Sequence, residues 1–501
     1  MNFYSELERI TKIQPKRSAI FWEGGSLSYM DFCNIANSIG SALSKIFNLK
    51  KGEHVALVME NDHLFLPILF GIWKAGLTAV PINSKLHKKE LAWIFENSDT
   101  KLIFCSKDKI SDIHSNMPVI VNYSKEFIKT STFEHLPHLK TDVTDPAWIF
   151  YTSGTTGKPK GAVLTHRNLL FMSLAYFADV DSIDEKDIRL HAAPMTHGSG
   201  IYALPFILKG AKNYICQSNF EPEEIFGLLS TEENISFFAA PTMVKRLSSH
   251  PMASTNLKGL KTLEFGGAPM YLSDTKIALE IFGNTLYQLY GQGEAPMTIT
   301  NITKAMYSDK RKPYYKELLI SAGISRTACS VEVVDSNWNP VSLGEVGEII
   351  TKSDCVMKEY YKNEEATKKA LRNGWLLTGD LGSIDQHGIL TIKDRSKDMV
   401  ITGGMNVYPR EIEDVLLLHP DVKEGAVIGL EDDKWGEIIV AVLVLQKRRK
   451  NIVQILDNLC LQNLARFKRP KKYYFKEELP KNNYGKILKT HIRKEFSTLP
   501  S

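Results

Sequence analysis

The stretch Tyr151-Thr152-Ser153-Gly154-Thr155-Thr156-Gly157-Lys158-Pro159-Lys160-Gly161 is the most informative part of this sequence. It directly follows Trp148-Ile149-Phe150, an apolar run that predicts the end of a strand. Four Ser/Thr hydroxyls, three glycines and two lysines stand within eleven residues. Glycines let backbone N–H groups approach a phosphate, hydroxyls donate to its oxygens, and lysines balance its charge. The sequence therefore predicts a phosphate-binding loop after this strand.

The loop has two other interpretations. A flexible Gly/Thr surface loop would have a similar composition. A nucleoside-triphosphatase P-loop needs Gly, four residues, and then Gly-Lys-Ser/Thr. Here Gly154 and Gly157 are only three residues apart, and Pro159 follows Lys158, so no hydroxyl follows the lysine to hold magnesium. The spacing therefore argues against the P-loop.

The composition is that of an ordinary globular protein. The chain has 501 residues, 43% hydrophobic and 24% charged, which predicts two to four domains and excludes collagen-like, disordered and low-complexity classes. The longest apolar run, residues 64–73, is too short to span a bilayer. The six cysteines are at least 26 residues apart, which is no metal or redox spacing, and Met1–Arg9 has no signal-peptide layout. We expect a reduced, cytoplasmic protein.

Strand and helix patterns alternate over the first 390 residues. Strands are predicted at Val55–Val58, Leu102–Cys105, Phe237–Pro241 and Leu263–Gly267, the last two running into turns, and a helix near Leu64–Lys74. Such alternation predicts the α/β class, here a large multi-layer N-terminal domain with partly parallel sheets.

The pattern changes near Asp394. Beyond the Gly403-Gly404 break, the order is a helix over Pro409–Leu418, strands over Val422–Leu430 and Ile438–Leu445, a helix near Ile452–Leu464 and a strand near Tyr473–Phe475. This order predicts a small α+β domain. We place the large domain at 1–394, a hinge at 395–398 and the small domain at 399–501.

Basic charge is concentrated at the end of the chain. Residues 441–501 carry 15 basic and 4 acidic side chains, a net charge of +11, whereas the whole chain has +5. Such a surface suits a polyanionic ligand, a nucleic acid or an anionic membrane, and it could equally be a plain solvated face.

The loop at 151–161 resembles the signature of the adenylate-forming superfamily, which includes acyl-CoA synthetases, nonribosomal adenylation domains and luciferases. Further motifs follow in family order along essentially the whole chain. The resemblance implies an AMP-forming ligase with a mobile small domain. It assigns the ATP phosphates to Thr152, Ser153, Gly154, Thr155, Thr156, Gly157 and Lys158.

Two segments resemble the acyl and adenine sites of the family. Pro194–Gly200 matches the acyl-site segment, and His197 falls at the position that lines the carboxylate pocket. The turn Gly266-Gly267-Ala268-Pro269 matches the one that flanks the adenine. The resemblance therefore assigns His197 to the catalytic site and Gly267 and Ala268 to the nucleotide.

The segment Tyr290-Gly291-Gln292-Gly293-Glu294 matches the one in which the tyrosine stacks on adenine and the glutamate holds Mg²⁺. A triphosphate needs a hard cation with oxygen ligands, which fits Glu294. Gly293 departs from the family, where a threonine hydroxyl reaches the α-phosphate. Either a backbone N–H or a water makes that contact here, or the acyl pocket is enlarged at Gly293.

The remaining motifs lie toward the C-terminus. The resemblance gives Asp380 both ribose hydroxyls, Arg395 a second ribose contact, and Lys397 the hinge position. Gly403 and Gly404 match the loop that lines the pantetheine tunnel of CoA after the small domain rotates. Lys486 matches the catalytic lysine, whose ammonium bridges the attacking carboxylate and the α-phosphate.

The acyl pocket is assigned by position only. Its candidate residues are small or apolar, and none has a basic side chain that could pair with a second carboxylate: Tyr202, Ala240, Gly266, Gly291, Gly293, Pro296 and Met297. We expect a medium- or long-chain fatty acid, or else an aromatic carboxylate. Residues 195–204 contain no acidic side chain to bind an amino group, which argues against an amino acid.

The expected function is an acyl-CoA synthetase that uses ATP, Mg²⁺ and CoA. One alternative is an adenylating enzyme that loads a separate carrier protein; only eleven residues follow Thr490, so no fused carrier domain is expected. Another is a non-catalytic nucleotide-binding protein. We expect a small carboxylic acid, ATP and CoA as partners and no nucleic acid. A weak membrane-surface association and a homodimer stay open.

Overall fold

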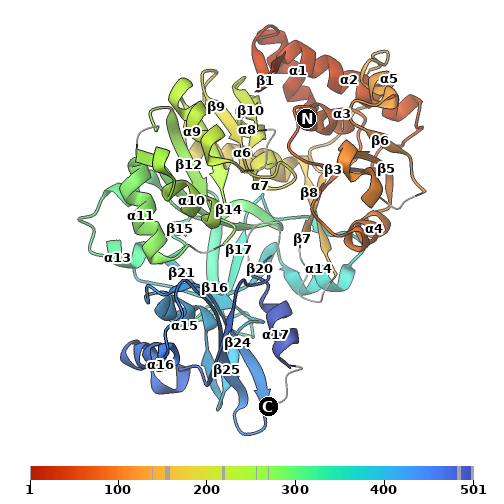
Figure 1. Cartoon of the computed structure of the whole chain (residues 1–501). Helices are drawn as coiled ribbons and strands as arrows, with labels where there is room; N and C mark the ends of the chain where they lie inside the picture. The colour runs from red at the N-terminus through yellow and green to blue at the C-terminus, as the bar shows by residue number, and fades with distance from the viewer. Residues whose placement is uncertain are drawn as a thin grey trace.

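The computed structural model describes residues 2–113, 116–137, 139–152, 158–216, 220–254, 257–268, 270–481 and 487–497. Within these residues the chain forms four β-sheets, with one of them in a C-terminal unit below the others in Figure 1. The predicted α/β class with a large N-terminal and a small C-terminal domain is confirmed.

The sheet that carries the loop-bearing strand has the order β18-β8-β7-β4-β3-β5-β6. Its strands are β3 (His54–Met59), β4 (Thr78–Asn83), β5 (Thr100–Cys105), β6 (Val119–Val121), β7 (Pro146–Thr152), β8 (Lys160–Thr165) and β18 (Glu359–Tyr360). Neighbours from β7 to β6 are parallel, and β8 is antiparallel to β7. β3 is buried on both faces, as its continuous apolar sequence predicts: Val55 and Leu57 join one core, Ala56 and Val58 another.

The largest sheet has the order β15-β14-β13-β12-β11-β9-β10-β1-β2. Its strands are β1 (Ser18–Trp22), β2 (Gly25–Ser28), β9 (Ile188–His191), β10 (Lys212–Ile215), β11 (Ile235–Ala239), β12 (Leu260–Phe265), β13 (Leu286–Gln292), β14 (Ala295–Ile302) and β15 (Ile324–Ser325). The inner strands are parallel, and β14, β15 and β2 are antiparallel additions. The partly parallel arrangement therefore matches the prediction.

A third sheet leads toward the C-terminal unit. It has the order β16-β17-β20-β19, with β21 paired to β20, from β16 (Ser330–Val334), β17 (Gly347–Lys352), β19 (Leu371–Arg372), β20 (Trp375–Ile384) and β21 (Leu390–Arg395).

Helices of the large unit cover the sheets. They are α1 (Phe3–Ile13), α2 (Tyr29–Lys45), α3 (Phe65–Lys74), α4 (Lys88–Asn97), α5 (Lys125–Ser131), α6 (His166–Asp179), α7 (Gly198–Ile201), α8 (Ala203–Leu208), α9 (Pro222–Thr231), α10 (Pro241–Ser248), α11 (Leu272–Phe282), α12 (Lys304–Ser308), α13 (Tyr315–Leu318) and α14 (Glu364–Ala370). Short 3₁₀ turns lie at Lys107–Asp112, Pro251–Ser254 and Gly283–Thr285. One large core, which contains α1–α3 and α6–α8, reaches both large sheets.

The C-terminal unit has its own sheet and two cores. The sheet order is β23-β22-β25-β24 with β26 paired to β25, from β22 (Val400–Thr402), β23 (Met405–Val407), β24 (Val422–Asp432), β25 (Gly436–Leu445) and β26 (Lys472–Lys476). Helices α15 (Pro409–Leu416) and α16 (Ile452–Asn463) pack on one face and α17 (Lys489–Ser497) on the other, with a 3₁₀ turn at Arg466–Lys468. Alternate residues of β25 therefore serve different cores.

Most predicted elements are confirmed within two or three residues. One boundary was wrong: Pro241 begins helix α10 instead of ending a strand in a turn, since proline is well suited to a first helical position. Helix α15 ends at Leu416, two residues before its predicted end. Strands β22 and β23 and helix α17 were not predicted. Among the described residues, no helix is both long and apolar enough to cross a membrane.

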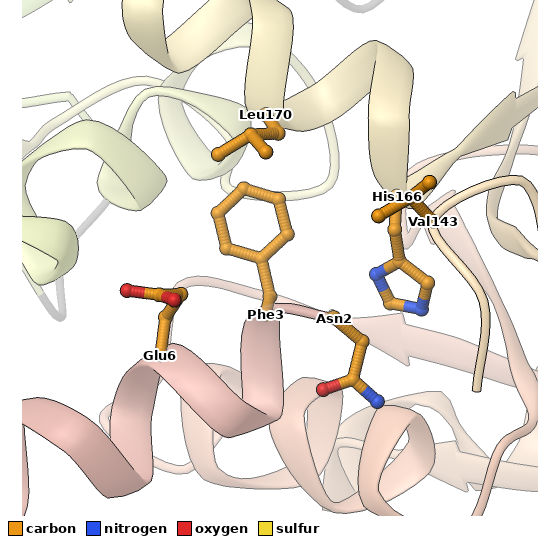
Figure 2. Close-up of a pocket in the computed structure, with 6 residues that line it drawn as sticks. All are labelled: Asn2, Phe3, Glu6, Val143, His166 and Leu170. Carbon is orange, nitrogen blue, oxygen red and sulfur yellow. The ribbon is translucent and has the colours of Figure 1, made fainter. Parts of the chain in front are cut away.

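A small cavity lies between α1 and the start of α6, away from all predicted site residues (Figure 2). Its volume of about 10 Å³ has room for one water at most. Six residues line it: Asn2, Phe3, Glu6, Val143, His166 and Leu170. Burial lowers the pKa of His166 to about 4, so this imidazole is neutral at pH 7. We treat the cavity as part of the packing of α1 on α6.

The core of the large unit holds an ion pair that is completely buried. Arg189 on β9 donates from Nη1 to both carboxylate oxygens of Glu264 on β12, at 2.8 and 2.9 Å, and both side chains are 0% exposed. The hydroxyl of Tyr176 donates to the same carboxylate at 2.6 Å. These bonds tie α6 to the largest sheet.

We expect Glu264→Ala to lower the free energy of unfolding of the large unit by about 3–5 kcal/mol, because it leaves the Arg189 guanidinium buried without its partner. Urea denaturation followed by circular dichroism measures the change. Glu365→Ala is the control, since it removes an exposed Glu–Lys pair with Lys369. A Glu264→Ala shift no larger than that of the control would contradict the expectation.

Candidate active site

Strand β7 carries two side chains toward the candidate site. Phe150 and Thr152 are two residues apart, so both point to the same side of the strand. Tyr151 points to the opposite side, where its hydroxyl donates to Asn97 at 2.7 Å. The predicted phosphate-loop residues Ser153, Gly154, Thr155, Thr156 and Gly157 lie outside the described residues. Lys158 is described, and its ammonium lies 4.1 Å from the centre of the Trp93 ring.

A tight hairpin between β13 and β14 faces Thr152. Gln292 pairs with Ala295, so Gly293 and Glu294 form its turn. The Glu294 side chain is buried, and its Oε1 accepts a hydrogen bond from the Thr152 hydroxyl at 3.2 Å and one from the Tyr360 hydroxyl at 2.7 Å. Burial and the neighbouring Glu294 raise the pKa of Tyr360, so this phenol stays a donor. One carboxylate is thus fixed beside the end of the predicted phosphate loop.

Gly293 has no room for a side chain. A Cβ there would lie 2.5 Å from Cγ2 of Thr152 and 2.6 Å from Cδ1 of Phe150. The space that a threonine would fill is therefore taken by side chains of β7. The alternative of an acyl pocket enlarged at Gly293 is wrong, because Phe150 and Thr152 occupy that volume.

A bulge follows the hairpin on β14. The register of the β13–β14 pairing shifts between Tyr290, which pairs with Thr300, and Gln292. Met297, on β14, has a positive φ of 59°. A Cβ on Gly291 would lie 2.3 Å from the backbone nitrogen of Met297, so only glycine fits there. The carbonyl of Met297 accepts a 2.5 Å hydrogen bond from buried Arg326, which is itself paired with Asp179. The backbone of the predicted acyl-pocket residue Met297 is thus held from two sides.

His197 stands at the start of α7, beside Phe150. The two rings pack edge to face, with centroids 4.9 Å apart and planes at 80°. The Thr196 hydroxyl is hydrogen bonded to Nδ1 at 3.0 Å. Burial lowers the pKa of His197 to about 3, so the imidazole is neutral at pH 7. A neutral ring can donate to a carboxylate without forming an ion pair with it.

Asp380 on β20 is the second buried carboxylate of the site. Its Oδ2 accepts from the Tyr290 hydroxyl at 2.7 Å and from Gln292 Nε2 at 2.8 Å, and Oδ1 lies 3.5 Å from Nε of Arg395. Burial and Asp380 raise the pKa of Tyr290. The predicted adenine and ribose residues Tyr290, Asp380 and Arg395 therefore lie together. Tyr290 belongs to β13, the strand that leads into the turn with Glu294.

The other predicted site residues of the large domain differ in their packing and exposure. Gly266 packs so closely on Leu289 that a Cβ would lie 2.4 Å from its carbonyl oxygen, while Gly267 is exposed with a φ of 82° and Ala268 is half-buried. Tyr202 is fully buried, with its ring 5.0 Å from Tyr176 and 5.1 Å from the Arg189 guanidinium. Its place in the acyl pocket stays a prediction, as do those of Ala240 and Pro296.

The remaining candidate residues belong to the predicted hinge and the C-terminal unit. Lys397 is exposed, and partial desolvation together with Arg395 lowers its pKa. Gly403 and Gly404, both with positive φ, form the β22–β23 turn, and Gly403 lies against the Trp435 ring. Lys486 lies outside the described residues.

Charged groups surround the start of the predicted hinge. Lys489 Nζ lies 2.8 Å from Glu413 and 3.9 Å from Asp394. Burial raises the pKa of Asp394, and Lys489 opposes that shift. The Arg410 guanidinium lies 4.1 Å from the centre of the Tyr271 ring, a contact between α15 and the large unit.

Sequence reasoning missed three functional candidates: Phe150, Gln292 and Tyr360. Gln292 lies inside a recognised motif, and Phe150 directly precedes one, so position could have drawn attention to both. Tyr360 is 66 residues from the Glu294 that it contacts, and no spacing signals that pairing. Among the described residues no cluster of three or more His, Cys, Asp or Glu side chains could hold a metal. A cation bound by Glu294 would therefore need its other ligand atoms from a bound molecule such as a nucleotide.

Two protein-family models match most of the chain. A family model described as AMP-binding enzyme matches residues 7–361, and one described as AMP-binding enzyme C-terminal domain matches residues 411–486. The long-chain-fatty-acid–CoA ligase FadD13 of Mycobacterium tuberculosis is 33% identical over 491 residues, which are 95% of this chain and 94% of that protein.

Two further relatives are similar over their full length. The feruloyl-CoA synthase of an Amycolatopsis species is 31% identical over 492 residues, covering 97% of this chain and 98% of that protein. The structure of o-succinylbenzoate CoA synthetase (MenE) from Bacillus subtilis, in complex with the acyl-adenylate intermediate OSB-AMP, matches with a TM-score of 0.88 and 26% identity, covering 100% of this chain and 99% of that one.

We expect the His197 ring to stay neutral between pH 5 and 8, because its folded-state pKa is lowered to about 3 by burial. NMR of ¹⁵N-histidine-labelled protein measures the ring titration, and the His197→Asn variant identifies the signal by its loss. A titration midpoint above about pH 5.5 for that signal would contradict the buried, neutral ring.

Proposed function

This chain belongs to the AMP-binding enzyme family, and we propose how its residues carry out the two-step reaction of an acyl-CoA synthetase. The chain is a ligase that forms a carbon–sulfur bond: a carboxylate and ATP give acyl-AMP and pyrophosphate, and the acyl group then passes to CoA with release of AMP. The observation that carries the proposal is the placement of Glu294, Thr152, Asp380 and Tyr290 in one cluster. Catalysis then rests on positioning and electrostatics.

Glu294 fits a Mg²⁺ that accompanies ATP. Its carboxylate is buried, lies in the turn of a hairpin and is next to the phosphate loop. A hard cation that is already bound by several phosphate oxygens needs only one or two protein carboxylates. When bound, the ion neutralises charge on the phosphates. Thr152 and Tyr360 fix the carboxylate by donating to the same oxygen, Oε1, which leaves Oε2 for the cation.

Asp380 fits the ribose of ATP. A carboxylate can accept two hydrogen bonds from a vicinal diol. In the structure Oδ2 accepts from Tyr290 and Gln292, and Arg395 neighbours Oδ1. These donors hold the carboxylate in place, and the ribose hydroxyls would add to or replace them. The loop residues 152–158 and the glycine turn Gly266-Gly267-Ala268 are assigned to the phosphates and the adenine by family resemblance.

His197 is proposed to orient the acid substrate. A neutral imidazole can donate one hydrogen bond to the carboxylate and leaves its charge available for attack on the α-phosphate. A cation at this place would stabilise the nucleophile before reaction. Phe150 and Met297 supply the apolar surroundings.

The small domain is proposed to rotate between the two half-reactions. We place its hinge at 395–398 about Lys397, between the large domain 1–394 and the small domain 399–501. In the first half-reaction Lys486 bridges the carboxylate and the α-phosphate as charge builds. In the second, Gly403 and Gly404 line the path of the pantetheine arm.

CoA is the proposed acceptor, attracted by the basic residues of the small domain. Exposed basic residues there are Lys447, Arg448, Lys450, Arg466, Lys471 and Lys472. Lys468 and Arg469 are neutralised by Glu411 and Asp457, so the effective charge is smaller than the sequence count. Attraction of this face to an anionic membrane surface remains a second proposal.

The substrate is proposed to be a fatty acid of medium or long chain, with an aromatic carboxylate as the second choice. The walls near His197 are Phe150, Phe238 and Met297, all apolar. The related proteins activate a long-chain fatty acid and ferulate, which span the same two classes.

The test is pyrophosphate release with ATP and Mg²⁺ over a panel of carboxylic acids, with and without CoA. We expect release with one acid class that accelerates when CoA is added, with an acyl-CoA product by mass spectrometry. Release that is indifferent to CoA would instead make a carrier protein the acceptor. No release with any acid, despite ATP binding, would leave a nucleotide-binding protein and overturn the proposal.

We expect Lys486→Ala to slow acyl-AMP formation by roughly 10²–10³-fold, by analogy with the loss of a single charge-stabilising donor. Thioester formation from supplied acyl-AMP should change far less, because the lysine acts only in the first half-reaction. Measuring both half-reactions separately tests this. Equal losses in the two would contradict a small domain that works in two positions.

A further inference from the structure

We propose that Phe150 determines which acids this enzyme accepts: its ring closes the acyl pocket beside the reacting carboxyl group and excludes acids that are branched at Cα. The inference rests on the proposed function, since it takes His197 as the residue that faces the substrate carboxylate. It names a substrate class, straight-chain or planar acids.

The first step of the argument is the position of the Phe150 ring. It lies between two groups assigned to the reacting end of the substrate. Its edge-to-face partner is His197, 4.9 Å away. Its other side fills the space over Gly293, where a Cβ would lie 2.6 Å from Cδ1 and 3.0 Å from Cε1. Because Glu294 follows Gly293 directly, the ring stands between the carboxylate site and the metal-binding hairpin.

The second step is that Gly293 and Phe150 form a matched pair. A side chain at 293 would collide with Phe150 and Thr152, so the glycine is what allows a large ring on β7. The pocket has therefore not gained space from the glycine. The space beside Gly293 is filled by the Phe150 ring and by Thr152, so an aromatic side chain stands where a side chain at 293 would lie.

The third step is that further apolar side chains border the same segment. A Cβ on Gly198 would lie 3.4 Å from Met297 Sδ and 3.6 Å from the Phe238 ring, so these side chains lie against the segment that carries His197. The backbone of Met297 is held by its close approach to Gly291 and by the buried Arg326. A substituent next to the substrate carboxyl would therefore meet Phe150 in surroundings that are already filled by apolar side chains.

The energetic scale follows from the discrimination that apolar pockets achieve. One misplaced methyl group typically changes kcat/KM by about 10–200-fold. We expect the wild-type enzyme to favour hexanoate, or benzoate if the aromatic class is the substrate, over its α-methylated or ring-saturated analogue by a factor in that range.

The experiment measures this ratio in Phe150→Ala and in a matched control. Phe21→Ala is the control, because Phe21 is also half-buried and packs edge to face on Tyr214 with centroids 4.9 Å apart, away from the site. We expect Phe150→Ala to lower the ratio at least tenfold while the KM for ATP stays within about twofold, and Phe21→Ala to leave the ratio unchanged.

A swap of the pair supplies a second test. Gly293→Thr alone should reduce pyrophosphate release with every acid, because the new side chain meets Phe150 and Thr152. The double variant Phe150→Ala/Gly293→Thr should recover release, since the smaller β7 residue vacates that space. No recovery, with both proteins folded by circular dichroism, would show that Phe150 does not limit this volume.

Binding separates this inference from the proposed function. Hexanoyl-sulfamoyladenosine and its 2-methyl analogue mimic the acyl-AMP, and calorimetry compares their dissociation constants without turnover. The wild type could release no pyrophosphate and still prefer the unbranched mimic, with that preference lost in Phe150→Ala. This result would support the role of Phe150 and contradict the proposed function. Equal selectivity in wild type and Phe150→Ala, by turnover or by binding, overturns the inference.

Discussion

The site depends on one buried carboxylate, that of Glu294, which must be hydrogen bonded because an unpartnered buried charge is costly. Its donors come from parts of the chain that are far apart in sequence: Thr152 at the end of β7 and Tyr360 on β18. Strand β18 pairs with β8, which returns from the phosphate loop, so both donors belong to the sheet that carries this loop. The hairpin with Glu294 belongs to the other large sheet. Satisfying one carboxylate thus fixes the two sheets against each other at the place where the triphosphate is proposed to bind.

The same hairpin couples the proposed metal site to the proposed acyl site through close packing. Gly293 accepts the Phe150 ring, Gly291 accepts the backbone of Met297, and Glu294 lies between them and the phosphate loop. Interiors packed at this density transmit small displacements, so a side chain added at either glycine would move both the carboxylate and the acyl wall. Arg326 extends the unit to α6 through Asp179. The proposed acid specificity and the proposed binding of the metal therefore depend on the same hairpin.

The sequence predicted the class and the order of many elements, because long apolar runs such as 438–445 are local signals. Its motifs, through the family resemblance, predicted Thr152, Tyr290, Glu294, Asp380 and Arg395, but not the donors Gln292 and Tyr360. It could not predict that Phe150 fills the space over Gly293, since this contact joins residues 143 positions apart and only packing reveals it. The short strands β22 and β23 were missed because three residues carry too little periodicity. Helix α17 was missed because its apolar face consists mainly of Ile492 and Phe496 among charged residues. The position of Tyr202 in its motif likewise did not predict that its ring packs on Tyr176.

Contacts around residues 394–398 bear on how freely the small domain can rotate. Lys489 and Glu413 belong to the same domain and lie 2.8 Å apart, so that ion pair would move as a unit, while Asp394, 3.9 Å from Lys489, would stay with the large domain. The Arg410–Asp414 pair would likewise move together. Rotation would break the stacking of Arg410 on Tyr271, the 3.0 Å hydrogen bond from the Arg410 backbone N–H to Asp394, and the contact of Lys489 with Asp394. The cation–π contact contributes about 0.5–2 kcal/mol. Because Arg410 and Lys489 each keep a carboxylate partner within their own domain, rotation would leave neither cation unpaired, and binding of acyl-AMP or CoA can supply the free energy that shifts such an equilibrium.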